Sequence, residues 1–134
     1  MIIGSIYRHP HDSNLDEFFS EFIKTTEKIS ANNSLVLAGD FNINTSKSSE
    51  TTVSKKYKDL LLSLGLTNLI SKPTRIANSS ETILDHILTN VPLQKLNCGV
   101  VEHDVADHLP TFAIFNSTVQ NRSVYQDSYY SRGG

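Results

Sequence analysis

Two polar residues follow a short apolar run that has the length and composition of a buried strand. The run is Leu35 to Ala38, and Gly39, Asp40, Phe41 and Asn42 come directly after it. In extended backbone, residues two apart project to the same side, ~6.6 Å apart along the strand. The Asp40 carboxylate could accept a proton from water, and the Asn42 amide could donate to a phosphoryl oxygen. A plain turn, for which Gly, Asp and Asn are common, explains the same pattern.

The dipeptide Asp-His occurs twice in the second half of the chain. Asp85 lies inside the apolar run Ile83 to Leu88, where burying a carboxylate is costly unless it meets a charged or donating partner. A histidine from another strand is a natural partner, because the pair fixes the imidazole tautomer. The alternative is an alternating strand with Asp85 on its wet face. Asp107-His108 precedes Leu109-Pro110, and there His108 could act as a base or bind phosphate while Asp107 holds a divalent metal.

Tyr7 ends the first apolar run beside Arg8. Its hydroxyl could donate to a phosphate and Arg8 could pair with one, although packing of the ring in the core is the more frequent role of such a tyrosine. Zinc is not expected, since no zinc-ligand spacing links His9, His11, His103 and Cys98.

The elements that must position these residues alternate through the first half of the chain. Ile2 to Tyr7 and Leu35 to Ala38 are predicted strands, and a helix is predicted from about residue 14 to 30. After a polar loop at 44–54, a second helix is expected over Tyr57 to Leu64, closed by Gly65. This order predicts an α/β layered fold with two main helices.

The second half contains three further strand candidates with no helix between them. They are Ile83 to Leu88, Gly99 to Glu102 and Thr111 to Phe115, which predicts antiparallel or mixed pairing. Residues 1–118 are therefore interpreted as one domain portion, and the polar stretch 119–134 as a tail or linker.

Composition limits the classes of function. The formal net charge of −2 excludes a broad basic face, so any contact with nucleic acid must be local. The only cysteine, Cys98, excludes an internal disulfide, fits a reducing compartment and predicts no disulfide-linked partner. There is no apolar run of membrane-spanning length and no signal-peptide pattern, so we expect an intracellular protein, nuclear or cytoplasmic. The sequence does not predict the oligomeric state.

Four motifs, taken in order, resemble the endonuclease/exonuclease/phosphatase superfamily. The segment Lys72-Pro73-Thr74-Arg75, which precedes the third motif, is similar to the apurinic-type endonuclease domain of LINE-type, jockey-like non-LTR retrotransposons. The resemblance covers roughly residues 3–115. The four motifs are Ser5-Ile6-Tyr7-Arg8-His9-Pro10, Gly39-Asp40-Phe41-Asn42, Thr82-Ile83-Leu84-Asp85-His86-Ile87 and Val105-Ala106-Asp107-His108-Leu109-Pro110.

The resemblance implies a fold, a reaction and a set of residue roles. The fold is part of a four-layered α/β sandwich with a mixed sheet, and the reaction is phosphodiester hydrolysis with Mg²⁺ or Mn²⁺. Asp40 would activate water, while Asn42 and His108 would contact the scissile phosphate. Asp85 would orient His108, and Tyr7 would add a hydrogen bond to the phosphate. Asp107 would assist the metal or the leaving group.

The family's metal-binding Glu comes from strands that precede the motif around Tyr7, and nothing precedes it here. We therefore expect a domain that lacks its first half and its main metal ligand. The leading hypothesis is a fragment of a DNA-nicking endonuclease, normally followed by a reverse transcriptase. The alternatives are a phosphatase or lipid phosphodiesterase of the same superfamily, and an inactive remnant or non-catalytic binding module.

Overall fold

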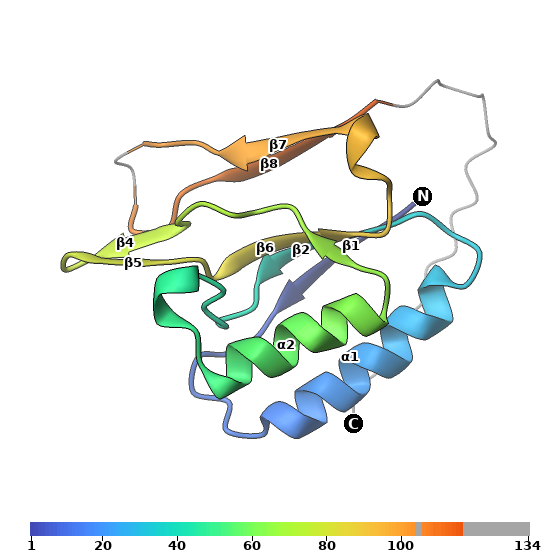
Figure 1. Ribbon diagram of the computed structural model, residues 1–134, viewed down its shortest axis with the longest axis horizontal. Coiled ribbons are helices and arrows are strands. Elements are labelled where there is room, and N and C mark those ends of the chain that lie inside the picture. The colour runs from blue at the N-terminus through green and yellow to red at the C-terminus, as the bar shows by residue number, and fades with distance from the viewer. Residues whose placement is uncertain (104–105, 117–134) are drawn as a thin grey trace.

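A four-stranded mixed sheet forms the middle of the molecule in the computed structural model, which describes residues 1–103 and 106–116 (Figure 1). Its strand order is β1 (Ile2–Tyr7), β2 (Leu35–Asp40), β6 (Asp85–Thr89) and β3 (Thr67–Asn68). β1 and β2 pair in parallel, whereas β6 pairs antiparallel with both β2 and β3. The predicted α/β class and mixed sheet are confirmed. The predicted tail at 119–134 lies outside the described residues.

Two helices cover one face of this sheet. α1 (Leu15–Ser30) begins as predicted, because the Asn14 side chain accepts a hydrogen bond from the Glu17 N–H. α2 (Thr52–Ser63) begins earlier than predicted, inside the segment interpreted as a loop. Thr51 and Ser54 form a reciprocal capping box there. The end of the polar stretch is therefore the start of the helix and not a continuation of the loop.

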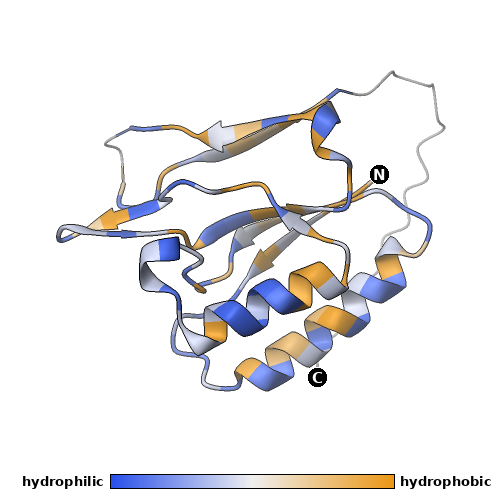
Figure 2. Cartoon of the chain, viewed as in Figure 1, coloured by the Kyte–Doolittle hydropathy of each residue, from blue (hydrophilic) through white to orange (hydrophobic). Residues whose placement is uncertain are grey.

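The larger core lies between the sheet and the helices. Apolar residues recur along both helices (Figure 2). Buried residues of α1, β2 and α2 pack together there, with aromatic rings among them. The buried aromatic members are Phe19, Phe22, Phe41 and Tyr57. No helix in 1–103 or 106–116 is long and apolar enough to cross a membrane.

The opposite face of the sheet carries a smaller core under a β hairpin. The hairpin consists of β7 (Leu96–Val100) and β8 (Thr111–Phe115), so the strand expected at Gly99 to Glu102 begins three residues earlier and ends two earlier. Val36, Ile83 and Ile87 are buried beneath it. At the β1 side this face is open, where Ile3 is 75% exposed.

A second, short hairpin was missed by the sequence analysis. β4 (Arg75–Ala77) and β5 (Ser80–Thr82) pair antiparallel around Asn78 and Ser79, both of which have positive φ. The strands are three residues long and largely polar, so they lack the apolar alternation by which a strand is recognised. Two 3₁₀ turns, Lys47–Ser49 and Leu93–Lys95, complete the described elements.

Candidate active site

Three polar side chains form a row across the ends of β1, β2 and β6. Tyr7 is in register with Asp40 on the parallel neighbour, and Asp40 is directly opposite Asp85 on the antiparallel one. Side chains alternate along a strand, so all three project from the face that packs under the β7–β8 hairpin. The parallel pairing of β1 and β2 brings the ends of both strands to one edge of the sheet.

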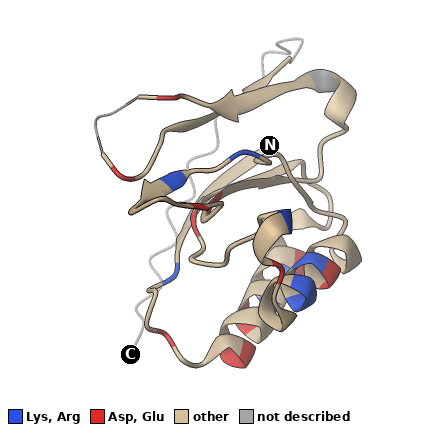
Figure 3. Ribbon diagram, turned by 60° about the vertical axis from the view of Figure 1, so that its left-hand side comes forward, with Lys and Arg blue, Asp and Glu red and all other residues tan. Residues whose placement is uncertain are grey.

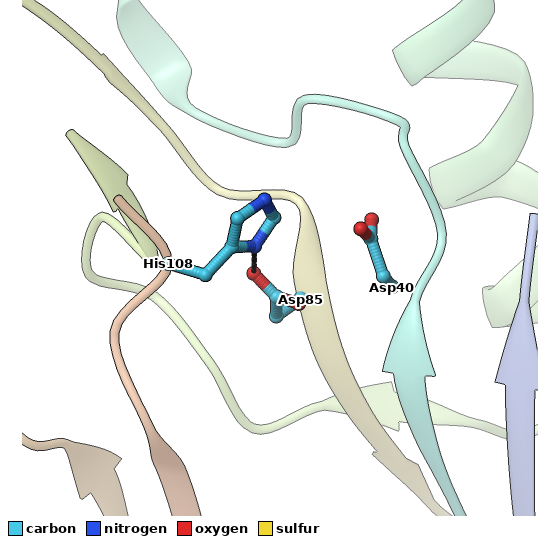
Figure 4. Close-up of side chains that lie close together, drawn as sticks. All are labelled: Asp40, Asp85 and His108. Carbon is cyan, nitrogen blue, oxygen red and sulfur yellow. Dashed lines mark hydrogen bonds and ion pairs between the residues drawn. The ribbon is translucent and has the colours of Figure 1, made fainter. Parts of the chain in front are cut away.

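His108 reaches this row from a segment that adds to the short hairpin. It forms an isolated antiparallel bridge with Arg75, supported by a hydrogen bond from the Leu109 N–H to the Thr74 carbonyl at 2.6 Å. The His108 Nδ1–H donates to Asp85 Oδ2 at 2.8 Å (Figure 4). Because the Nδ1–H is used in this hydrogen bond to Asp85, the imidazole presents Nε2 to a ligand. Both side chains are part-buried.

Asp40, Asp85 and His108 could together hold a divalent cation. One ligand atom from each lies within 4.8 Å of the others. Two carboxylates directly opposite each other on neighbouring strands repel unless a cation or a protonated group lies between them. Carboxylate oxygens suit Mg²⁺ and Mn²⁺, and an imidazole nitrogen suits the transition metal better than Mg²⁺. The donor set therefore fits a hard divalent ion held chiefly by the two carboxylates.

The local backbone fixes where the Asp40 carboxylate lies. A Cβ at Gly39 would come 1.7 Å from the Ile6 carbonyl oxygen, so only glycine lets β1 approach here. Asn42 adopts φ 49°, a left-handed conformation that asparagine tolerates better than most residues. Its backbone N–H donates to Asp40 Oδ1 at 3.0 Å. This hydrogen bond orients the carboxylate toward the row of polar side chains.

The Asn42 side chain is engaged inward. Its Nδ2 donates to the Arg8 carbonyl at 2.6 Å, which leaves one N–H of the amide and its oxygen for any ligand. Arg8 likewise turns inward rather than toward a phosphate. Tyr7 is 68% exposed, so its hydroxyl is free for contact at the rim of the site rather than buried in the core.

Asp107 lies outside the cluster of Asp40, Asp85 and His108. Its carboxylate accepts a hydrogen bond from Arg75 Nε at 3.2 Å. That hydrogen bond is the main reason why the pKa of Asp107 lies below its usual value, and the nearby His108 adds to the effect. Asp107 therefore forms an ion pair with Arg75 beside His108, and it does not join Asp40 and Asp85 in the cluster.

Thr74 is a positioning residue that the sequence analysis did not single out. It is fully buried, and its Oγ1 accepts hydrogen bonds from the backbone N–H groups of Leu84 at 3.0 Å and Asp85 at 3.1 Å. Thr74 therefore holds the backbone of Asp85 through its side chain and the backbone of Leu109, the neighbour of His108, through its carbonyl. The available signal was a threonine in the segment between Lys72 and Arg75.

A groove of about 700 Å³ adjoins the site on the hairpin side. Its lining includes Lys72, Pro73 and Leu109, the last being the neighbour of His108 in the chain. On the helix side α1 carries mainly acidic and α2 mainly basic residues (Figure 3), so the two helices together give that side no single sign of charge. The other charged side chains of the lining are Glu81 and Glu102, so the single positive charge of Lys72 faces two negative ones.

Comparisons with known proteins identify relatives of this arrangement. The family model described as "Endonuclease-reverse transcriptase" matches residues 1–112. The endonuclease domain of TRAS1, a telomere-specific non-LTR retrotransposon, is similar in structure with TM-score 0.63 and 19% identity, covering 80% of this chain and 51% of that one. No curated protein matches the chain.

Two solved structures of Neisseria proteins share the fold. The 3′-5′ exonuclease NExo from Neisseria meningitidis gives TM-score 0.63 at 20% identity, covering 84% of this chain and 60% of that one. The 3′ phosphatase NExo bound to a product DNA hairpin gives 0.61 at 20% identity, covering 75% and 52%. The chain thus spans between half and three fifths of the length of these structures, and their likeness establishes the fold.

Proposed function

The chain belongs to the endonuclease-reverse transcriptase family, and on that premise we propose that it is the portion of a metal-dependent DNA endonuclease that carries the hydrolytic pocket. The observation that carries this proposal is the convergence of Asp40, Asp85 and His108, from three separate segments, within 4.8 Å of one another. In a non-LTR retrotransposon, the DNA that this endonuclease nicks would be the target site of insertion, and a reverse transcriptase would follow the endonuclease domain.

The reaction is hydrolysis of one phosphodiester bond. Asp40 takes a proton from water, whose oxygen forms a bond to phosphorus as the bond to the leaving sugar oxygen breaks and that oxygen takes up a proton. When Nε2 also carries a proton, His108 donates a hydrogen bond from it to the phosphate and offsets the charge that grows on the phosphate oxygens. Asp85 holds the imidazole ring in place through the 2.8 Å hydrogen bond to Nδ1. Asn42 and Tyr7 add contacts to the phosphate from the β1–β2 side.

A divalent ion, Mg²⁺ or Mn²⁺, would be held by Asp40 and Asp85. When bound it supplies positive charge that polarises the phosphoryl group and stabilises the transition state. Because the two carboxylates are opposite each other in register, the same ion would relieve their mutual repulsion. Asp107, which pairs with Arg75, would assist the metal or the leaving group from outside the pair of Asp40 and Asp85.

The substrate is proposed to be DNA because the chain belongs to the endonuclease-reverse transcriptase family and shares its fold with a 3′ phosphatase that was solved with a product DNA hairpin. The net charge of −2 for the whole chain means that contact with DNA phosphates must be local. For a DNA endonuclease of this kind we propose a location inside the cell, in the nucleus or the cytoplasm.

A phosphatase is the second candidate, favoured by the similarity to the 3′ phosphatase NExo. The same pocket would then remove a terminal phosphate instead of cutting an internal bond. The two reactions are distinguished by offering the chain a 3′-phosphorylated oligonucleotide and an intact supercoiled plasmid in parallel. A phosphatase releases phosphate from the first and leaves the second uncut.

The test is plasmid nicking in Mg²⁺ and in Mn²⁺. The parent protein is this chain joined at its N-terminus to the Glu-bearing strands that the family places before the motif around Tyr7, and it is compared with its variants Asp40→Ala and His108→Ala. Each variant is expected to lose about 10²-fold or more of the nicking rate, since each removes a group that acts on the transferring proton or on the phosphate. Asp59→Ala and His11→Ala remove the same residue types at exposed positions outside the cluster and are expected to keep the parent rate.

Nicking at the parent rate by Asp40→Ala and His108→Ala would contradict the proposal. A parent chain that neither nicks DNA nor gains thermal stability from Mn²⁺ would favour the non-catalytic alternative, because a ligand that binds only the folded state must raise Tm.

A further inference from the structure

Arg8 places its charged group inside the molecule, directly behind the site. The side chain follows Tyr7 at the end of β1 and is only 7% exposed. Its guanidinium donates to three backbone carbonyls: Nε to Phe41 at 2.8 Å, one terminal nitrogen to Asn42 at 2.9 Å and the other to Asp12 at 3.2 Å. Charge-assisted hydrogen bonds of this kind are stronger than neutral ones.

The contact is reciprocal. The Arg8 backbone N–H donates to the Asp40 carbonyl at 2.9 Å, and the Arg8 carbonyl accepts from Asn42 Nδ2 at 2.6 Å. Arg8 therefore contacts each of the three residues from Asp40 to Asn42 through hydrogen bonds. Asn42, held at φ 49°, is the residue whose N–H orients the Asp40 carboxylate. The guanidinium thus controls the position of Asp40 from two residues away.

The geometry of the fork matters as much as the charge. The planar guanidinium reaches the successive carbonyls of Phe41 and Asn42 at once, through Nε and a terminal nitrogen. A lysine ammonium in the same place is a point charge on a flexible stem and cannot match both acceptors in one fixed orientation. The Phe18 ring, 5.9 Å from the guanidinium carbon, packs against the charged group and limits its movement.

We propose that Arg8 is a positioning residue of the hydrolytic site, which holds the segment from Asp40 to Asn42 in the one conformation that aims the Asp40 carboxylate at the substrate. This inference rests on the proposed function for its catalytic consequence. It differs from the expectation that Arg8 pairs with a phosphate, since its donors point inward and away from any ligand.

The test compares the parent chain with Arg8→Lys and with the matched control Arg75→Lys. Arg75 pairs with Asp107 through its side chain, and its bridge to His108 is made by the backbone, which the substitution leaves in place. Two readouts are taken on each protein: amide hydrogen exchange of Asn42 by NMR, and kcat and KM for plasmid nicking with Mn²⁺. In Arg8→Lys, exchange at Asn42 is expected to accelerate by about tenfold or more, while the amides of Leu37 and Leu88 in the sheet keep their parent rates.

The kinetic signature separates positioning from binding. We expect kcat of Arg8→Lys to fall by about 10²-fold with KM unchanged, because a misplaced carboxylate slows the reaction without weakening substrate contact. Should Arg8→Lys fail to fold, Arg8→Ala with millimolar guanidinium chloride provides a second route. The free guanidinium ion is expected to restore kcat, whereas ammonium chloride at equal ionic strength is not.

Each failure has its own meaning. Unchanged exchange at Asn42 in Arg8→Lys overturns the positioning role whatever the activity. Faster exchange with parent kcat also overturns it, since the ordered segment would then be unnecessary for the reaction. A parent chain that never nicks DNA rejects the proposed function and Arg8's part in it, while the exchange rate at Asn42 still decides whether Arg8 orders the segment.

Discussion

The two sides of strand β6 use adjacent residues for opposite purposes. Asp85 projects toward the β7–β8 hairpin and pairs with His108, and His86 projects into the core beneath the helices. The Asp85 side is part-buried and polar, whereas the His86 side is closed and aromatic. A single Asp-His dipeptide thus supplies a group for the candidate site and a residue of the core, and the face of the sheet decides which is which.

His86 is a neutral core residue. It is 1% exposed and packs against the rings of both Phe41 and Tyr57, with ring centroids 5.1 Å and 5.4 Å away. Its Nε2–H donates to the Ile83 carbonyl at 3.0 Å, so Nδ1 accepts from the Tyr57 hydroxyl at 2.9 Å. Burial lowers the pKa of His86 and raises that of Tyr57, and both groups therefore stay uncharged.

This difference shows which face of the sheet can bind a ligand and act on it. On the helix side every polar atom of His86 and Tyr57 is satisfied within the protein, and nothing remains to meet a ligand. On the hairpin side Asp40, Asp85 and His108 keep polar atoms without a protein partner near the surface. Substitutions on the hairpin side should therefore lower activity, and substitutions on the helix side should lower stability.

The largest expected effect is on the Asp85 side. Asp85→Asn keeps the shape of the side chain but removes the acceptor charge that holds the His108 tautomer, and nicking should fall by about 10³-fold. Tm should change little, because the residue is part-buried and its backbone contacts to Thr74 survive. Nicking assays and thermal unfolding of the same preparation check both halves. A large drop in Tm with an unchanged nicking rate would reverse the assignment of the two sides.

His86→Ala is expected to fail in the other assay. Removing the ring leaves a cavity beside Phe41 and an unsatisfied Tyr57 hydroxyl, so the free energy of unfolding should decrease by about 2–4 kcal/mol. Urea unfolding measures this loss. The nicking rate per folded molecule should stay near the parent value, and a selective loss of activity at parent stability would place His86 in the site instead.

The buried histidine also predicts the direction of a pH effect. The unfolded chain binds a proton at His86 near the ordinary value of about 6.5, while the folded chain resists it. Stability should therefore be highest above pH 6.5 and decrease as the pH falls below it, by at most about 1.4 kcal/mol per pH unit from this group. His86→Phe should flatten the slope between pH 6.5 and 5.5, and His11→Ala should retain it.

Asp107→Asn should have the smallest effect. Its carboxylate is exposed and pairs with the exposed Arg75, and such surface pairs contribute little to stability. We expect an unchanged Tm and a nicking rate within about threefold of the parent. A loss as large as that of Asp85→Asn would make Asp107 a direct metal ligand after all.

The sequence predicted the fold well where apolar periodicity was strong. β1, α1 and the mixed sheet followed from apolar runs and a helix cap signal, and the pairing of Asp85 with a histidine from another segment followed from the cost of burying a carboxylate. The start of α2 and the β4–β5 hairpin were missed because both lie in polar stretches. Their formation depends on the Thr51–Ser54 capping box and on pairing between short strands, neither of which is marked by an apolar pattern.

The sides of β6 could not be assigned from sequence. The run from Ile83 to Leu88 is apolar on both faces, so alternation does not say whether Asp85 or His86 meets the helices. The inward turn of Arg8 and the support given by Thr74 were equally hidden, because both act through backbone groups of residues distant in the chain. Contacts of this kind become predictable only once the strand register is known.

A double-mutant cycle on Asp85 and His108 tests the central claim most directly. Nicking rates are measured for the parent, Asp85→Ala, His108→Ala and the double variant under one set of metal and DNA concentrations. If the two residues act as a unit in one hydrolytic pocket, the nicking rate of the double variant should lie within about threefold of the rate of His108→Ala. Losses that multiply, or single variants that nick as fast as the parent, would contradict the account.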